Sequence, residues 1–418
     1  MEQHQEEDRP WADAPPEVLT LIIGVLPSVA DRFRFGAVCR RWHGAERQLP
    51  KPKQLPWLAL PIPSYAEATH CTFVSLPDES AYELPFPAGG GRARYCGSAP
   101  GGWLVVAHRE RGANLLCNAF TGATVPLPHQ ATVRYDGHPV HGAPDPEWNR
   151  SEAYIRKAVL SAPPDAPGSG CVVAAIVNKH TLAVCRPGQG GSWQRVERRT
   201  AEEAEIDYED VVFYRGKLCA LDARELVHVF DVADGEDGRL TVTRSREGRV
   251  GQGLTRPRPE REVERDDLQR EVPLSFLSRY LVESGGRLLL VLRYARADRT
   301  YSVIRRTYMF RVLELVPGGP EQRHMAWAEL DGGLGGQVLF VGGSGSVSLA
   351  AADYFRGEAD ADCIYFTDDN FHVATAAKRE LPCRDIGRYS MRDRSVTFLD
   401  VQAPHNSRSP PTWLYVSE

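Results

Sequence analysis

The first part of the chain places apolar residues at helical spacing. Between residues 16 and 26 they recur three or four positions apart, at Val18, Leu19, Ile22, Ile23 and Leu26. This spacing is typical of an amphipathic helix. Pro15 and Pro16 suit its first turn, where a missing backbone N–H costs little, and Pro27 ends it.

A second helix is expected from Val29 to about Ala45. Ser28, followed three residues later by Asp31, fits the pattern of a capping box at its start. A segment of about 40 residues with two or three helices is too small to bury its own apolar faces. They must therefore pack on another surface, either the rest of the chain or a partner protein. The proline-rich bridge that follows separates them from the rest of the chain and favours the partner.

That bridge covers residues 50–64 and should be extended and stiff. Beyond it, short apolar runs alternate with Gly, Pro and Asp turns as far as the C-terminus. Clear runs are Gly102–Ala107, Val172–Val177, Val211–Tyr214, Arg287–Leu292, Val338–Val341 and Cys363–Phe366. Many short strands with regular turns predict an all-β fold. About 350 residues suit a propeller of four-stranded blades better than a single sandwich.

The blades can be counted from a loose internal repeat of a strand, a Gly-containing turn and a stronger apolar strand. Units of this kind lie near residues 95–128, 154–197, 210–245, 279–330 and 337–391. Two strand-like pieces remain at each end: Pro56–Leu60 and Cys71–Leu76, then Ser395–Val401 and Thr412–Val416. Because a two-stranded piece is marginally stable in water, we expect the two ends to combine. The prediction is about six four-stranded blades, closed by N- and C-terminal strands.

Two segments are expected to lie outside the folded units. Residues 1–8 form an acidic polar tail. Residues 239–271 mix arginines with acids and hold few apolar side chains, so they cannot bury enough surface to become ordered. The predicted organisation is a disordered tail at 1–8, a helical domain at 9–49, the linker at 50–64 and a propeller at 65–418 with a disordered insertion at about 239–271.

Composition narrows the class of protein. The 418 residues include 42% hydrophobic and 25% charged residues, which is ordinary for a soluble globular protein. The net charge is -5, and the chain lacks the basic domain of a nucleic-acid binder. No apolar stretch is long enough to span a bilayer. The nine cysteines are irregularly spaced and contain no CxxC. We therefore expect reduced thiols, no metal and no cofactor, in a cytoplasmic and/or nuclear protein.

Signals for catalysis are weak. The sequence Gly342-Gly343-Ser344-Gly345-Ser346 lacks the Gly-Lys-[Ser/Thr] of a phosphate-binding loop. Asp360, Asp362, Asp368 and Asp369 flank a strand, and we interpret them as solvated turn residues. We therefore expect no enzyme activity and no catalytic or metal-binding residues. A propeller enzyme with its site in the loops around the channel is the rival interpretation, and no acid–base group supports it.

Residues 11–42 resemble an F-box. The run Val38-Cys39-Arg40-Arg41-Trp42 matches the family's V-C-[RK]-x-W helix, and Pro15-Pro16-Glu17-Val18-Leu19 matches its entry, with Ala14 in place of the usual Leu. The resemblance implies docking on a Skp-type adaptor and, through it, on a cullin. The residues implied in adaptor binding are Pro15, Glu17, Val18, Leu19, Ile22, Leu26, Val38, Cys39 and Trp42.

The remainder resembles the plant F-box family with a C-terminal β-propeller of the DUF295 (KIB-type) class. The resembling motifs are Cys96-Gly97-Ser98, Gly102-Trp103-Leu104, Asn118–Gly122, Tyr280–Ser284, Val338–Gly342 and Asp362–Asp369. The resemblance implies a non-catalytic substrate receptor of a Skp–cullin–F-box ubiquitin ligase, whose propeller binds a protein substrate that the sequence does not identify. The alternative is a propeller scaffold with a decayed F-box, and Ala14 is the feature that favours it. Neither nucleic acid nor membrane is expected as a partner.

Overall fold

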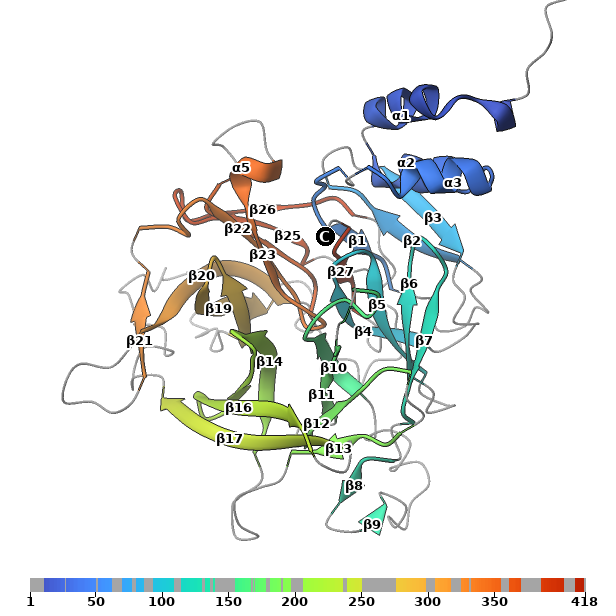
Figure 1. Cartoon of the computed structure of the whole chain (residues 1–418). Coiled ribbons are helices and arrows are strands. Elements are labelled where there is room, and N and C mark those ends of the chain that lie inside the picture. The colour runs from blue at the N-terminus through green and yellow to red at the C-terminus, as the bar shows by residue number, and fades with distance from the viewer. Residues whose placement is uncertain are drawn as a thin grey trace, which may run out of the picture.

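The structure is a computed structural model of the 418-residue chain, shown in Figure 1. It describes residues 11–26, 28–49, 52–61, 70–76, 80–85, 93–108, 114–129, 132–135, 138–139, 155–166, 168, 170–177, 181–188, 191–196, 206–235, 239–249, 276–297, 305–316, 325–330, 332–354, 361–369, 385–401 and 410–416. The predicted acidic tail at 1–8 lies outside these residues.

Three short helices precede the strands, after a 3-10 turn at Trp11–Asp13. They are α1 (Pro16–Val25), α2 (Val29–Gly36) and α3 (Arg40–Glu46). The single second helix predicted for residues 29–45 is therefore two, because the backbone at Cys39 is extended, with φ −162° and ψ 172°. Gly36 and the β-branched Val38, both weak helix formers, precede this break. Ser28 caps α2 as expected, since its Oγ accepts a hydrogen bond from the N–H of Ala30 at 3.1 Å.

The described strands form six blades around an axis, as Figure 1 shows. Blade 1 holds β4 (Ala93–Ala99), β5 (Trp103–His108), β6 (Asn114–Asn118) and β7 (Thr124–Leu127). Blade 2 holds β10 (Ile155–Leu160), β11 (Val173–Val177), β12 (Thr181–Cys185) and β13 (Gln194–Arg195). Blade 3 holds β14 (Tyr208–Tyr214), β15 (Lys217–Asp222), β16 (Leu226–Asp234) and β17 (Leu240–Arg249). Blade 4 holds β18 (Phe276–Ser284), β19 (Arg287–Ala297), β20 (Arg305–Val316) and β21 (Ala326–Glu329). A small hairpin of β8 (Arg134–Tyr135) and β9 (His138–Pro139) follows blade 1.

Blade 5 departs from the simple order. Its strands are β22 (Gln337–Val341), β23 (Val347–Ala350), β24 (Cys363–Phe366), β25 (Gly387–Ser390) and β26 (Ser395–Phe398), and a short helix, α5 (Ala351–Tyr354), follows β23. The sheet order is β23-β22-β24-β25-β26, and β22 pairs with β24 in parallel. The chain therefore forms the second strand of this blade, β22, before it forms the first strand, β23.

Blade 6 closes the ring from both ends of the chain, as predicted. Its order is β27 (Thr412–Leu414), β1 (Trp57–Ala59), β2 (His70–Val74) and β3 (Ala81–Pro85). Leu58 is the register partner of both Trp413 and Val74. The C-terminal segment also contacts blade 1, because the Oγ of Ser98 donates a hydrogen bond to the carbonyl of Trp413 at 2.6 Å.

One part of the closure prediction was wrong. Ser395–Val401 does not join blade 6, because residues 395–398 form β26 at the edge of blade 5, and β3 supplies the fourth strand of blade 6 instead. The reason is local. A tight turn at residues 391–394, with Arg394 at φ 54°, folds β26 back on β25 as an antiparallel hairpin.

The disordered insertion predicted at 239–271 was wrong for its first part, since Leu240–Arg249 forms β17. Leu240 and Val242 alternate with polar residues and pack into the core between blades 2 and 3. The many charged residues between positions 239 and 271 obscured this alternation of apolar and polar residues in the sequence. Residues 250–271 lie outside the described residues.

The core consists of apolar layers between neighbouring blades. Close packing of the inner strands of blades 1 and 2 requires a glycine at one point. A Cβ at Gly97 would lie 2.1 Å from the carbonyl oxygen of Ala158. No side chain fits at such a distance, so Gly97 allows β4 and β10 to approach closely.

Candidate functional site

The three helices enclose a small core of their own. Leu19 and Ile23 of α1 are buried against Phe35 of α2. Trp42 of α3 packs on Phe35 with ring centroids 4.3 Å apart, and its indole N–H donates to the carbonyl of Trp11 at 3.1 Å. These contacts hold α1 on α2 and α3 as one unit, which we call the helical segment.

The opposite side of α2 lies on the propeller. Val29 and Ala30 are buried in a cluster with Trp57 of β1 and Phe73 of β2. Phe33 stacks on Phe120 of the β6–β7 turn. The N–H of Val29 also donates to the side chain of Gln54 at 3.1 Å. The helical segment is therefore attached to blades 6 and 1, in addition to its connection through the linker.

Helix α1 leaves one apolar face uncovered. Leu21 is 71% exposed and Val25 is 77% exposed, and Val18, also exposed, lies three residues before Leu21. This spacing puts the three side chains on one stripe of the helix. We call Val18, Leu21 and Val25 the α1 face. Trp11, just before α1, and Val38, between α2 and α3, are exposed as well.

The residues predicted to bind an adaptor fall into three groups. Pro15, Glu17, Val18 and Val38 are exposed. Ile22, Leu26, Cys39 and Trp42 are partly buried. Leu19, at 1% exposure, is enclosed in the core of the helical segment, so its predicted place on the adaptor-facing surface differs from its position in the structure. Leu19 instead shapes the surface indirectly, by holding α1 against α2.

Leu21 and Val25 were missed by the motif comparison, although the sequence holds a signal for them. Almost every residue from Val18 to Leu26 is apolar, apart from Thr20 and Gly24. A helix that is apolar on most sides needs more than one packing partner. The helical segment covers only the side that carries Leu19 and Ile23.

Ala14 occupies a buried position in the same small core, at 9% exposure. It therefore lies where a larger Leu side chain would also point inward. The substitution reduces the apolar volume at the start of α1 but leaves the α1 face unchanged.

Buried ionic contacts join the first strands of neighbouring blades. Lys157 of β10 and Asp210 of β14 form a fully buried ion pair. Asp210 also accepts a hydrogen bond from the N–H of Leu281 at 2.7 Å, so it joins blades 2, 3 and 4. Because each charge has a partner from another blade, the pair serves to hold the blades in place.

A second buried network joins blades 4 and 5. The guanidinium of Arg293 donates to the carboxylate of Asp385 at 2.7 Å and to the hydroxyl of Tyr280 at 3.1 Å, and it lies 4.7 Å from the ring centroid of Phe366. Burial raises the pKa of the Asp385 carboxyl, although Arg293 opposes the shift. Arg293 also donates to the carbonyl of Thr367 at 2.7 Å, and Asp385 accepts from the N–H of Thr307 at 2.9 Å, so these buried groups are paired within the protein, which fits a structural role.

The buried thiols are poor nucleophiles. Burial raises the pKa of both Cys71 and Cys96 to about 12 and that of Cys117 to about 11. At neutral pH these groups are protonated, and the thiolate is the reactive form. Within the part of the chain that the structure describes, no three His, Cys, Asp or Glu residues gather closely enough to hold a metal ion.

Two acidic residues in turns accept hydrogen bonds from backbone N–H groups. Asp362 has a positive φ of 60°, and its carboxylate accepts hydrogen bonds from the N–H groups of Leu334 and Gly336. Asp369 accepts from the N–H of Gly343 at 2.8 Å. Neither is the solvated turn acid that we expected, because each satisfies backbone donors of a neighbouring turn.

Among the described helices, none is long and apolar enough to cross a membrane.

Several solved structures are similar to this chain at low sequence identity. Among solved structures, similarity extends to Kluyveromyces lactis Hsv2, with 11% identity over 63% of this chain and 68% of that chain and a TM-score of 0.31. A Lactobacillus plantarum protein has 11% identity over 84% of this chain and 98% of that chain, with a TM-score of 0.36. A chain of the crystal structure of BBS1N in complex with ARL6DN has 14% identity and a TM-score of 0.29, and the match covers 61% of this chain and 60% of that chain.

No curated protein matches the chain. The sequence profile described as "KIB1-4 beta-propeller" matches residues 73–390, which is most of the chain and includes strands from all six blades. This protein therefore belongs to the KIB1-4 beta-propeller family.

Proposed function

We propose that this protein is the substrate-recognition subunit of a Skp–cullin–F-box ubiquitin ligase. In this proposal the helical segment is the F-box, which docks on a Skp-type adaptor and through it on a cullin, and the propeller binds a protein substrate. The protein performs no chemistry itself. It raises the effective concentration of a substrate lysine near the conjugating enzyme.

The observation that carries the proposal is the uncovered α1 face. Leu21 and Val25 are more than 70% exposed, although α2 on the other side of the helical segment is buried against the propeller. A contiguous patch of exposed apolar side chains commonly marks a protein-interaction surface. An amphipathic helix that lays its apolar face into a groove of a partner is a common mode of docking.

The attachment of α2 gives the proposal a geometric consequence. Because Val29 and Phe33 fasten the helical segment to blades 6 and 1, a protein docked on α1 has a fixed position relative to the propeller. Such a fixed position suits a receptor that must present a substrate to an enzyme some distance away. In Figure 1, α1 lies on the side of the segment away from the blades.

The experiment is copurification of the full-length protein with a Skp-type adaptor and a cullin. Leu21→Asp combined with Val25→Asp should abolish it, because truncating apolar anchors at such an interface costs roughly 2 kcal/mol or more each, about thirtyfold in affinity. Both side chains are exposed, so the variant should fold normally. Ala328→Asp, at an exposed apolar residue of β21 in blade 4, is the matched control and should bind as the wild type does.

Wild-type copurification of the double variant would refute docking through the α1 face. If the wild-type protein itself bound no adaptor, the alternative of a propeller scaffold with a decayed F-box would gain support. Ala14, which replaces the usual Leu, would then be the first residue to test as the cause. The proposal also places the protein in the cytoplasm or nucleus, where reducing conditions keep cysteines free. It involves no cofactor, nucleic acid or membrane.

A further inference from the structure

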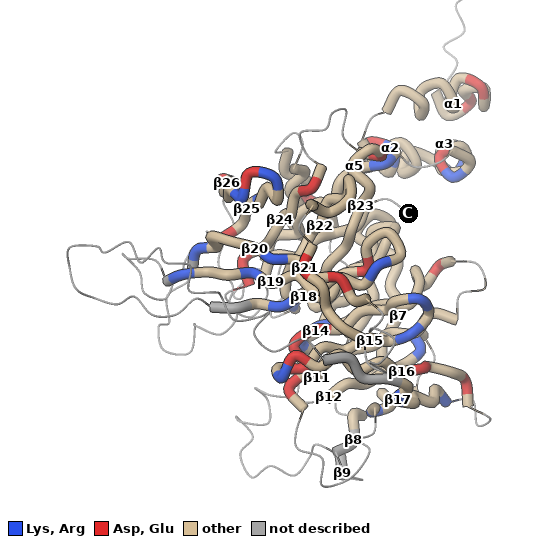
Figure 2. The backbone as a smooth tube through the Cα atoms, turned by 90° about the vertical axis from the view of Figure 1, so that its left-hand side faces the viewer, with Lys and Arg blue, Asp and Glu red and all other residues tan. Residues whose placement is uncertain are grey.

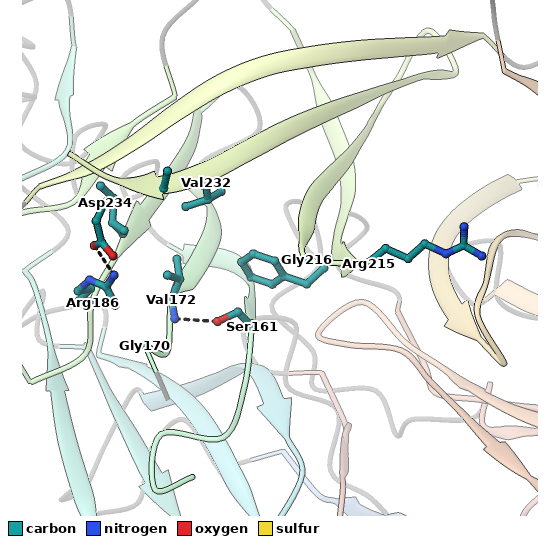
Figure 3. A pocket seen from close by; sticks show the side chains of 11 residues that line it. Ser161, Gly170, Val172, Arg186, Arg215, Gly216, Val232 and Asp234 are labelled. Atoms are coloured by element: carbon teal, nitrogen blue, oxygen red, sulfur yellow. Dashed lines mark hydrogen bonds and ion pairs between the residues drawn. The ribbon is translucent and has the colours of Figure 1, made fainter. Parts of the chain in front are cut away.

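The hollow between blades 2 and 3 is bounded by polar groups that are paired within the propeller. It has a volume of about 480 Å³ (Figure 3). Arg186, which follows β12, forms an ion pair with Asp234 at the end of β16. The N–H of Val172 donates to the hydroxyl of Ser161 at 2.9 Å. Because these groups already have partners, they do not indicate which ligand the hollow would bind. The helical segment carries a clearer signal.

This signal is Gly24, an exposed glycine inside α1 that the fold itself does not require. Glycine is the weakest helix former after proline, so its presence within a helix usually has a packing or functional reason. The backbone of Gly24 is not in the left-handed region that favours glycine. Apart from its chain neighbours and the helix backbone, a Cβ at this position would meet no atom of the described residues within 4 Å. Neither backbone conformation nor packing within the protein therefore explains this glycine.

Gly24 lies beside the exposed apolar residues of α1. Side chains four residues apart form rows along the surface of a helix. Leu21 and Val25 form one such row, and both are exposed. Thr20 and Gly24, also exposed, form the next row, which is lower because Gly24 has no side chain and that of Thr20 is short. The exposed surface of α1 therefore consists of an apolar ridge with a groove along its side.

The groove can be covered without leaving the hydroxyl donor of Thr20 unpaired. Its Oγ1 donates a hydrogen bond to the carbonyl of Pro16 in the first turn of α1, at 2.8 Å. A polar donor that loses water on binding and gains no partner costs free energy, and this contact within the helix removes that cost. The groove at Thr20 and Gly24 therefore suits a partner surface that excludes water.

A ridge beside a groove is the kind of surface through which two helices pack. Side-chain rows of one helix fit into grooves of the other, usually with about 8–10 Å between the helix axes. A glycine in the groove permits the partner to come closer to the backbone. We propose that a helix of the Skp-type adaptor packs across α1 with a row of its side chains in the groove at Gly24, while Leu21 and Val25 enter a groove of that helix. This inference rests on the proposed function, and it makes Gly24 the residue that sets how closely the adaptor approaches.

The test measures binding of the full-length protein to a purified Skp-type adaptor by isothermal titration calorimetry. Gly24→Leu fills the groove and should weaken binding at least tenfold, whereas Gly24→Ala, which adds one methyl group, should weaken it less. Both variants should melt at or above the wild-type temperature, because alanine and leucine are better helix formers than glycine and the added Cβ meets open space in the free protein. Weaker binding by a protein that is no less stable cannot result from misfolding.

Gly44 of α3 provides the matched control. It is also an exposed glycine inside a helix, and a Cβ there would meet nothing within 4 Å either. The residues three and four positions away from it are exposed and polar: Arg40, Arg41, Arg47 and Gln48. No apolar ridge therefore lies beside Gly44 on this helix. Gly44→Leu should melt at or above the wild-type temperature, as the Gly24 variants do, and should leave adaptor binding unchanged.

The outcomes separate this inference from the proposed function. Wild-type affinity in Gly24→Leu, or equal weakening in Gly44→Leu, would overturn close packing at Gly24. The ligase role would still stand if the Leu21→Asp/Val25→Asp variant lost the adaptor. A wild-type protein that binds no adaptor would overturn both. Light scattering of the full-length protein alone tests a second copy as the occupant, since a dimer that Gly24→Leu converts to a monomer would assign α1 to self-association and overturn the adaptor contact.

Discussion

Phe33 of α2 stacks on Phe120 of the β6–β7 turn, with ring centroids 4.5 Å apart and ring planes 5° from parallel. Phe120 in turn meets the edge of Trp57 at 5.5 Å, and Trp57 is fully buried in blade 6. The three rings form a continuous contact from the helical segment into the propeller core. In Figure 2, α2 and α3 lie close above the strands, as this contact requires.

Removing the stack should release the helical segment without unfolding the propeller. Phe33→Ala loses a partly buried ring and a stacked pair worth roughly 0.5–1.5 kcal/mol beyond its buried area. Hydrogen exchange of α2 and α3 should therefore accelerate at least tenfold, with the blades unchanged. Phe398→Ala, another substitution of a partly exposed ring, is the control. Unaltered exchange in α2 would show that the linker and Val29 alone hold the segment.

Closure of the ring should make the last strand essential for the whole β-domain. Trp413 is buried, and its indole N–H donates to the carbonyl of Val341 in blade 5 at 3.0 Å. Trp413→Ala should lower the unfolding free energy by about 3–5 kcal/mol, and deletion of residues 410–418 should lower the Tm of all blades together. Calorimetry measures both effects, with Trp11→Ala at an exposed tryptophan as control. A truncated protein that melts within a degree or two of the full chain would contradict closure.

Arg293 should be needed for the junction of blades 4 and 5. Arg293→Met leaves Asp385 buried without its ion-pair partner, and breaking a buried pair in this way costs about 3–5 kcal/mol. Arg296→Met, at an exposed arginine of the same strand that stacks on Tyr308, is the matched control and should cost less than about 1 kcal/mol. Urea unfolding of the two variants provides the comparison. Equal stability would mean that the network is dispensable.

The buried thiols should make the fold sensitive to alkali. Burial raises the pKa of Cys96 to about 12, so the unfolded chain loses this proton at lower pH than the folded chain does. The unfolding free energy must therefore fall as the pH rises above about 9, by up to about 1.4 kcal/mol per pH unit for this thiol. Cys96→Ala should lessen the slope between pH 9 and 11 in urea unfolding experiments. Cys39→Ala is the control, and an unchanged slope in Cys96→Ala would disprove the assignment.

The sequence by itself determined the class of fold. A period of three to four residues before the linker and short apolar runs after it gave helices followed by strands, because these patterns depend only on neighbouring residues. The need to pair the strand pieces left over at both ends also predicted the closure through Thr412–Leu414 and Trp57–Ala59. The loose repeat placed the blades at nearly their observed positions.

Only the tertiary structure decided which apolar side chains of α1 are free. Leu19 and Leu21 have the same side chain and lie two residues apart, yet one is enclosed by Phe35 and the other is 71% exposed. A motif cannot distinguish them, because exposure depends on where α2 and α3 lie. The same holds for Ser395–Phe398, whose partner strand was decided by a turn, and for Arg186 and Asp234. These last two meet because blades 2 and 3 pack side by side, a contact between residues 48 positions apart that no local pattern encodes.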